Sequence, residues 1–114
     1  MAVPQLTVCE MAPFSEWADR CLSEVERIAL TDFVAAFPTA GDLVPNSGGV
    51  RKLRWRLAGR GKRGGARVIY FFGGVHIPLF LVMAYDKLRK ADLTSAELKQ
   101  MRELTAQLKR MARV

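Results

Sequence analysis

Alternating apolar and polar residues predict β-strands in the second half of the chain. In residues 50–57, apolar positions alternate with Lys52, Arg54 and Arg56, so a strand here would bury one face and display cations on the other. Residues 67–72 are β-branched and aromatic on both faces, which is typical of a central strand. Further strands are expected over residues 5–11 and 77–87, the latter with every second residue from Ile77 to Lys87 on one face. Gly73 and Gly74 predict a tight hairpin turn before that strand.

Three segments have the period of helices. Pro13 suits the first turn of a helix over residues 14–21. Ser23 and Glu26 form a capping box for a second helix, whose apolar positions are Val25, Ile28, Ala29, Phe33, Ala36 and Phe37. Residues 42–49 have the composition of a turn, and Thr94 and Glu97 begin a third helix with a second capping box. The order β-α-α-β-β-β-α predicts one α+β domain over residues 1–114, with an antiparallel sheet packed against helices.

Charge is divided unevenly along the chain. The formal net charge is +7, but residues 1–48 carry two bases and seven acids, while residues 49–114 carry sixteen bases and four acids. The net charges of these two parts are therefore −5 and +12. Residues 48–72 contain no acid and eight bases, namely Arg51, Lys52, Arg54, Arg56, Arg60, Lys62, Arg63 and Arg67. Concentrating like charge costs self-repulsion, so this segment predicts a polyanionic partner such as RNA.

Several other kinds of site are not indicated by the sequence. Cys9 and Cys21 lack CxxC spacing, and the only histidine, His76, has no partner motif and is expected at the surface. Trp55 and Tyr70 stand among apolar neighbours, so we expect them in the core and not as base-stacking groups. No apolar run is long enough to span a bilayer, and residues 1–10 lack the features of a signal peptide. We therefore expect a cytoplasmic protein without a metal, a cofactor or a membrane anchor.

Three ordered blocks of residues resemble a known family. They are GGVRKLRW at residues 48–55, GKRGGARVIYFF at residues 61–72, and Tyr85-x-Lys87 followed by Asp92-Leu93-Thr94. Together they resemble the HigB branch of the RelE/ParE toxin superfamily, of a phage-derived type, over about residues 41–111. The resemblance implies a RelE-like fold and the toxin of a type II toxin–antitoxin module. It further implies a ribosome-dependent mRNA endonuclease that inhibits translation and is neutralised by a HigA-like helix-turn-helix antitoxin.

By the same resemblance, the candidate catalytic residues are Lys52, Arg54, Arg67, Tyr85 and Lys87. The remaining bases of the cationic segment are candidates for binding RNA, and these are Arg51, Arg56, Arg60, Lys62 and Arg63. The chain departs from the common family pattern at Asp86, Leu88 and Arg89. We expect the acid beside Lys87 and the additional base at residue 89 to alter the specificity of the site.

These residue types suit RNA cleavage by attack of the 2′-hydroxyl on its own phosphate. Arg54 and Arg67 could clamp the phosphate, because a guanidinium binds phosphate through two parallel hydrogen bonds. Lys52 or Lys87 could exchange protons, and Tyr85 could hold a nucleotide. Two alternatives stay open: a catalytically decayed toxin or non-catalytic RNA-binding protein, and a ParE-like gyrase inhibitor on the same fold.

Overall fold

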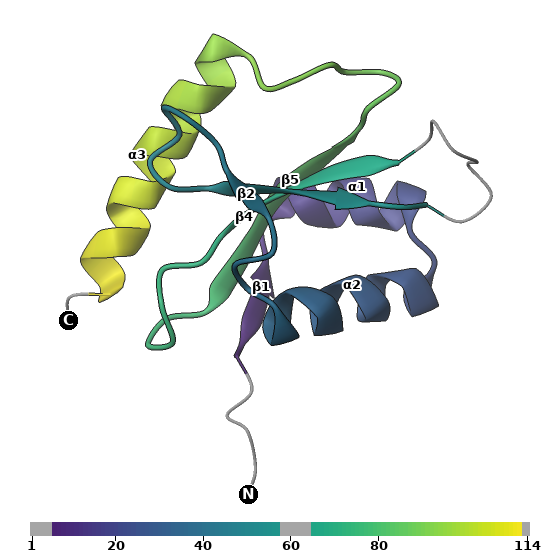
Figure 1. The fold of residues 1–114 in the computed structure, drawn as a ribbon, viewed down its shortest axis with the longest axis horizontal. Coiled ribbons are helices and arrows are strands. Elements are labelled where there is room, and N and C mark those ends of the chain that lie inside the picture. Colours follow the sequence, from purple (N-terminus) through teal and green to yellow (C-terminus); the bar gives the residue numbers. More distant parts are fainter. Residues whose placement is uncertain (1–5, 58–64, 113–114) are drawn as a thin grey trace, which may run out of the picture.

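The computed structural model describes residues 6–57 and 65–112, which form a five-stranded sheet with helices on both faces (Figure 1). In chain order the elements are β1 (Val8–Glu10), α1 (Ala12–Cys21), α2 (Glu24–Ala36), β2 (Asp42–Leu43), β3 (Arg51–Trp55), β4 (Ala66–Phe71), β5 (Leu79–Asp86) and α3 (Ser95–Ala112). The strand order in the sheet is β1-β5-β4-β3-β2. The α+β class is confirmed, and the predicted element order holds with the addition of the two-residue strand β2.

The sheet is mixed, whereas the sequence predicted a wholly antiparallel one. β1 pairs parallel to β5, with Val8 opposite Leu79, while the other three pairings are antiparallel. A parallel pairing needs a long crossover, and α1 to β4 supply it here. The segment expected to be only a turn also contributes to the sheet, because Asp42 and Leu43 pair with the first two residues of β3.

Each face of the sheet has its own core. On one face, α1 and α2 bury Phe14, Trp17, Leu30 and Val34 against the sheet (Figure 1). Tyr70 is fully buried in this core, where its hydroxyl donates to the Pro38 carbonyl and accepts from the Gly41 amide.

On the opposite face, α3 packs Met101 and Leu108 against Ile69 and Phe71 (Figure 1).

The predictions that Tyr70 and Trp55 lie in the core are both confirmed. Tyr70 is fully buried, and the ring of Trp55 packs against Phe33 in the same core at a centroid distance of 5.8 Å. His76 is exposed, as expected. No helix within the described residues is both long and apolar enough to cross a membrane.

Both predicted capping boxes are present. The Glu26 amide donates to Ser23 Oγ at 3.1 Å, and the Glu97 amide donates to Thr94 Oγ1 at 3.1 Å, with the reciprocal bonds also made. Only part of the apolar series expected in α2 faces the core, because Phe33 packs there beside the buried residues Leu30 and Val34, whereas Val25 is 77% exposed. Apolar residues occur all round this helix, so the period alone did not select the face that packs.

A β-bulge divides β5 between the two cores. Ile69 pairs with Met83 and Tyr70 pairs with Leu81, which leaves Val82 as the additional residue. Leu79 and Leu81 therefore face α1 and α2, whereas Met83 and Tyr85 face α3. The single common face predicted from Ile77 to Lys87 is wrong for this reason. The tight turn at Gly73 and Gly74 is also wrong, because residues 72–78 form a longer connection.

Candidate nucleic-acid interface

A row of polar side chains crosses three strands on the α3 face of the sheet. Arg54 on β3 pairs with Arg67 on β4, which pairs in turn with Tyr85 on β5. Directly opposed residues have Cβ atoms about 5 Å apart. Lys52 lies two residues before Arg54 on β3 and is opposite Ile69, so it shares this face. The structure thus brings together four of the five predicted catalytic residues.

The charges of the two arginines have no acidic partner in the described part of the chain. Arg54 is exposed and makes no hydrogen bond or ion pair there. Arg67 is half-buried, and its guanidinium makes one long contact, 3.4 Å from Nη1 to the Ala66 carbonyl oxygen. Like charges directly opposite one another on neighbouring strands are destabilising. A phosphate bound between the two guanidinium groups would remove this repulsion and accept charge-assisted hydrogen bonds from both.

Tyr85 places a buried hydroxyl at the end of this row. Its side chain is 6% exposed, and the hydroxyl has no hydrogen-bond partner among residues 6–57 and 65–112. Burial raises the pKa of Tyr85, the charges of Asp92 and Glu97 act in the same direction, and Arg67 opposes them. The hydroxyl therefore keeps its proton at neutral pH. It is a donor without an acceptor, beside a pair of arginines.

The connection from β5 to α3 completes the site. Lys87 is exposed directly after β5, and its ammonium donates to the Ala91 carbonyl. Lys52 Nζ lies 3.5 Å from Asp92 Oδ1. The Leu93 amide lowers the pKa of Asp92, and the charges of Lys52 and Lys87 lower it further. Asp92 was singled out in the sequence only as part of a family block, and its contact with Lys52 could not be predicted from that block.

The predicted RNA-binding residues fall in different places. Arg51 pairs with Tyr70 and so lies on the opposite face, where its Nη1 donates to the carbonyls of Thr39 and Gly41 at 3.2 and 2.8 Å. Arg56 is exposed immediately after β3. Arg60, Lys62 and Arg63 lie outside the described residues.

A cavity of about 460 Å³ adjoins this row at the outer edge of β5. Its walls come from α1, from the last three residues of β5 and from the turn that follows, and they include Trp17, Arg20 and Arg89. Sequence reasoning missed the contribution of α1, because nothing in residues 12–21 indicates which strand end the helix will reach. Two of the three positions that depart from the family pattern, Asp86 and Arg89, line this cavity.

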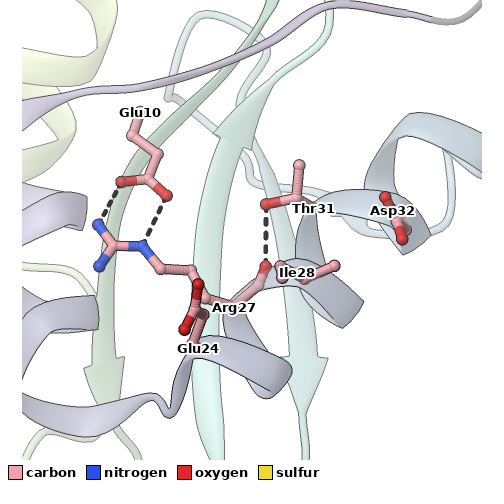
Figure 2. Close-up of a pocket in the computed structure, with 6 residues that line it drawn as sticks. All are labelled: Glu10, Glu24, Arg27, Ile28, Thr31 and Asp32. Atoms are coloured by element: carbon pink, nitrogen blue, oxygen red, sulfur yellow. Dashed lines mark hydrogen bonds and ion pairs between the residues drawn. The ribbon is translucent and has the colours of Figure 1, made fainter.

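A second hollow, of about 410 Å³, lies between β1 and α2 and has the opposite character (Figure 2). Three carboxylates line it, those of Glu10, Glu24 and Asp32. Its one arginine, Arg27, already binds Glu10 through two hydrogen bonds and Asp19 through a third. The guanidinium of Arg27 lowers the pKa of Glu10, which keeps that carboxylate charged. A polyanion would be repelled here, so this hollow is excluded as an RNA site.

Comparison with known families agrees with the geometry. The family described as the RelE toxin of the RelE/RelB toxin–antitoxin system matches residues 20–114. The match covers five-sixths of the chain and includes every residue that the sequence proposed for the site. Within residues 6–57 and 65–112, no three His, Cys, Asp or Glu side chains gather as a metal site would require. The chain belongs to the RelE toxin family.

Proposed function

We propose that this protein is a ribosome-dependent mRNA endonuclease, the toxin of a type II toxin–antitoxin module of the HigB branch. The observation that carries the proposal is the row formed by Arg54, Arg67 and Tyr85. Two opposed guanidinium groups without a carboxylate partner among the described residues, next to a buried hydroxyl donor, make a surface that suits an anion with several oxygen atoms. The scissile phosphate of mRNA is such a group.

Cleavage proceeds by transfer of the phosphoryl group within the RNA strand. The 2′-oxygen attacks the adjacent phosphorus, the bond from phosphorus to the 5′-oxygen breaks, and the products carry a 2′,3′-cyclic phosphate and a 5′-hydroxyl. Arg54 and Arg67 stabilise the charge that develops on the non-bridging oxygens, and rigid strands hold both side chains. One proton leaves the 2′-hydroxyl and one reaches the 5′-oxygen, and Lys52 and Lys87 are the groups that exchange them. The ribosome positions the message.

The antitoxin of this proposal is a HigA-like helix-turn-helix protein with an acidic segment. The cationic face formed by Lys52, Arg54, Arg67 and Lys87 is the surface that such a segment would cover. Complementary charge accelerates association more than it increases final affinity. We expect the association rate of toxin and antitoxin to fall with salt, with a smaller change in the dissociation rate, as measured by stopped-flow mixing. Rates that do not respond to salt would contradict masking of this face.

The decisive experiment is expression of the chain alone in a bacterial host, with primer extension on a translated message. We expect growth arrest and defined cut sites for the wild type. Arg67→Ala should reduce the cleavage rate by on the order of a hundredfold, the scale of losing one preorganised donor to a transition state. Arg110→Ala, an exposed base near the end of α3, is the matched control and should cut normally.

The alternatives give different results in the same experiment. Normal growth with abundant folded protein would contradict the toxin proposal and favour a decayed or RNA-binding protein. Growth arrest with intact messages and broken DNA would point to a gyrase inhibitor. Cleavage by Arg67→Ala at the wild-type rate would mean that Lys52, Arg54 and Lys87 act without it.

A further inference from the structure

We propose that the cavity at the outer edge of β5 binds the nucleotide next to the scissile phosphate, with Arg20 and Arg89 holding its phosphate group. This inference rests on the proposed function and assigns a second part of the RNA to a place on the protein. It gives a substrate-binding role to α1, which carries none of the residues predicted for the site.

The cavity exists because β5 is longer than its outer neighbour. β1 pairs only with Leu79 to Leu81, so the outer edge of residues 82–86 has no strand beside it in the described part of the chain. α1 packs against β5 and its last turn forms one wall, with Trp17, Arg20 and Cys21. The turn after β5 forms the other wall, with Arg89 and Lys90.

The positive charge on these walls is complementary to the negative charge of a phosphate. Arg20 and Arg89 are exposed, and neither side chain has an ion-pair partner among the described residues. Lys90 is the third base, but its ammonium is bound to Glu97 at 2.7 Å and lies 5.9 Å from the Tyr85 ring centroid. Two guanidinium groups are therefore left to bind an anion from opposite walls.

Asp86 fixes the wall that carries Arg89. Its Oδ1 accepts a hydrogen bond from the Leu88 amide at 2.9 Å, and its carbonyl accepts from the amides of Arg89 and Lys90 at 3.0 and 3.1 Å. The carboxylate thus orders the turn. This contact accounts for an acid within a cavity that otherwise has basic walls.

The apolar part of the lining favours a nucleotide over a free phosphate. Trp17, Cys21 and Ala84 line the cavity together with Tyr85, which gives a base an apolar surface beside the two cations. Tyr85 belongs both to this lining and to the row with Arg67. Adjacent strands are about 4.8 Å apart, so the cavity lies on the order of 10 Å from Arg67, which is near enough for an adjoining nucleotide of one strand.

The two cysteines of the chain allow a direct test of occupancy. Cys21 lines the cavity and Cys9 lies on β1, and both thiols are free and half-buried. The probe is a trinucleotide with a 2′-methoxy group at every position, which cannot be cleaved because the attacking hydroxyl is absent. Iodoacetamide labelling of the wild-type chain, read by mass spectrometry, should show that the probe protects Cys21 and leaves Cys9 reactive.

The variants then identify the groups that bind. Arg20→Ala and Arg89→Ala should each raise the probe concentration for half-protection of Cys21 by roughly tenfold, the scale of one charge-assisted hydrogen bond. Arg110→Ala should leave it unchanged. The inference is overturned if a probe concentration that saturates binding, measured by anisotropy, leaves Cys21 fully reactive. It is also overturned if an acidic peptide of equal charge protects Cys21 as well as the trinucleotide does.

A cleavage measurement separates this inference from the proposed function. In a translation extract, Arg20→Ala and Arg89→Ala should weaken the nucleotide preference next to the cut, whereas Arg67→Ala should lose cleavage and still show protection of Cys21. Protection without cleavage by the wild type would refute the endonuclease and support the subsite. Cleavage without protection would refute the subsite alone.

Discussion

At the scale of single residues, the hydroxyl groups of two buried tyrosines differ in their hydrogen-bond partners. Tyr70 is 0% exposed, and its hydroxyl has two partners, the Gly41 amide at 2.8 Å and the Pro38 carbonyl at 2.9 Å. Tyr85 is 6% exposed, and its hydroxyl has no partner in the part of the chain that the structure describes. A buried polar group without a partner costs stability, so the hydroxyl of Tyr85, unlike that of Tyr70, gives the fold no stabilising hydrogen bond among the described residues.

Removal of the Tyr70 hydroxyl and removal of the Tyr85 hydroxyl should therefore have different effects on stability and on cleavage. We expect Tyr70→Phe to lower the free energy of unfolding by about 1–3 kcal/mol, because it leaves the Gly41 amide without its acceptor, and to preserve cleavage. Tyr85→Phe should leave stability unchanged or slightly raised and should slow cleavage of ribosome-bound mRNA by about tenfold or more. Urea denaturation and primer extension measure the two quantities. Equal destabilisation by both variants would show that Tyr85 has a structural partner.

Much of the candidate site could be predicted at the residue scale, and the failures have a common cause. Alternation along residues 50–57 was enough to put Lys52 and Arg54 on one face. It also implied that Arg51 is on the other face, but its contacts with the Thr39 and Gly41 carbonyls depend on how the chain leaves α2. The partnership of Lys52 with Asp92 likewise joins segments far apart in the sequence. Local patterns contain no information about such contacts.

At the scale of elements, one additional residue in β5 decides which face Tyr85 occupies. Without the bulge at Val82, the regular alternation of β5 would place Tyr85 with Leu79 and Leu81, on the side of α1 and α2. With it, Tyr85 is opposite Arg67 on the α3 side. The strand itself was predictable from its composition. The bulge was not, since it reflects the fit of β5 to β4 and to both cores.

The turn between β2 and β3 is positioned by a close approach to α3. Gly48 has a φ of +79°, and a Cβ there would lie 2.1 Å from Thr105 Oγ1. Arg102 of α3 also donates to the Asn46 carbonyl at 2.7 Å. The turn therefore connects the start of β3 to α3, on the face of the sheet that carries Lys52, Arg54 and Arg67. The glycines of this segment were read as turn residues, but their contact with a helix over 50 residues away had no sequence signal.

This contact predicts unequal costs for two glycine substitutions. We expect Gly48→Ala to lower the free energy of unfolding by on the order of 2–4 kcal/mol, through overlap with Thr105 added to backbone strain. Gly74→Ala is the matched control, because Gly74 also has a positive φ, +109°, but a Cβ there would meet nothing within 4 Å. It should cost only the strain, about 1–2 kcal/mol. Urea denaturation measures both, and equal costs would mean that the turn moves away from α3 freely.

At the scale of the whole molecule, charge separates into two sides. The hollow between β1 and α2 is lined by three carboxylates (Figure 2), whereas the row of Arg54, Arg67 and Tyr85 lies on the face of the sheet that packs against α3. This separation follows the division of charge along the chain, since most acids belong to residues 1–48. Such a molecule would approach RNA with its α3 face first, because long-range attraction orients it before contact. The division of charge along the chain indicates such a separation, but Arg51 of β3 lies on the face of α1 and α2.

The last prediction uses salt to count the phosphates that this face binds. Four described cations of the site, Lys52, Arg54, Arg67 and Lys87, would release about 0.7 counterion each on binding a single strand. The logarithm of the association constant for a 2′-methoxy oligonucleotide should then fall with the logarithm of KCl concentration with a slope of about −3 or steeper. Fluorescence anisotropy titrations at several salt concentrations measure this slope. Arg54→Ala should make it shallower by about 0.7, because one phosphate contact is lost, and Arg110→Ala should leave it unchanged. A slope near zero, or one that Arg54→Ala does not alter, would show that the opposed arginines bind something other than a nucleic-acid backbone.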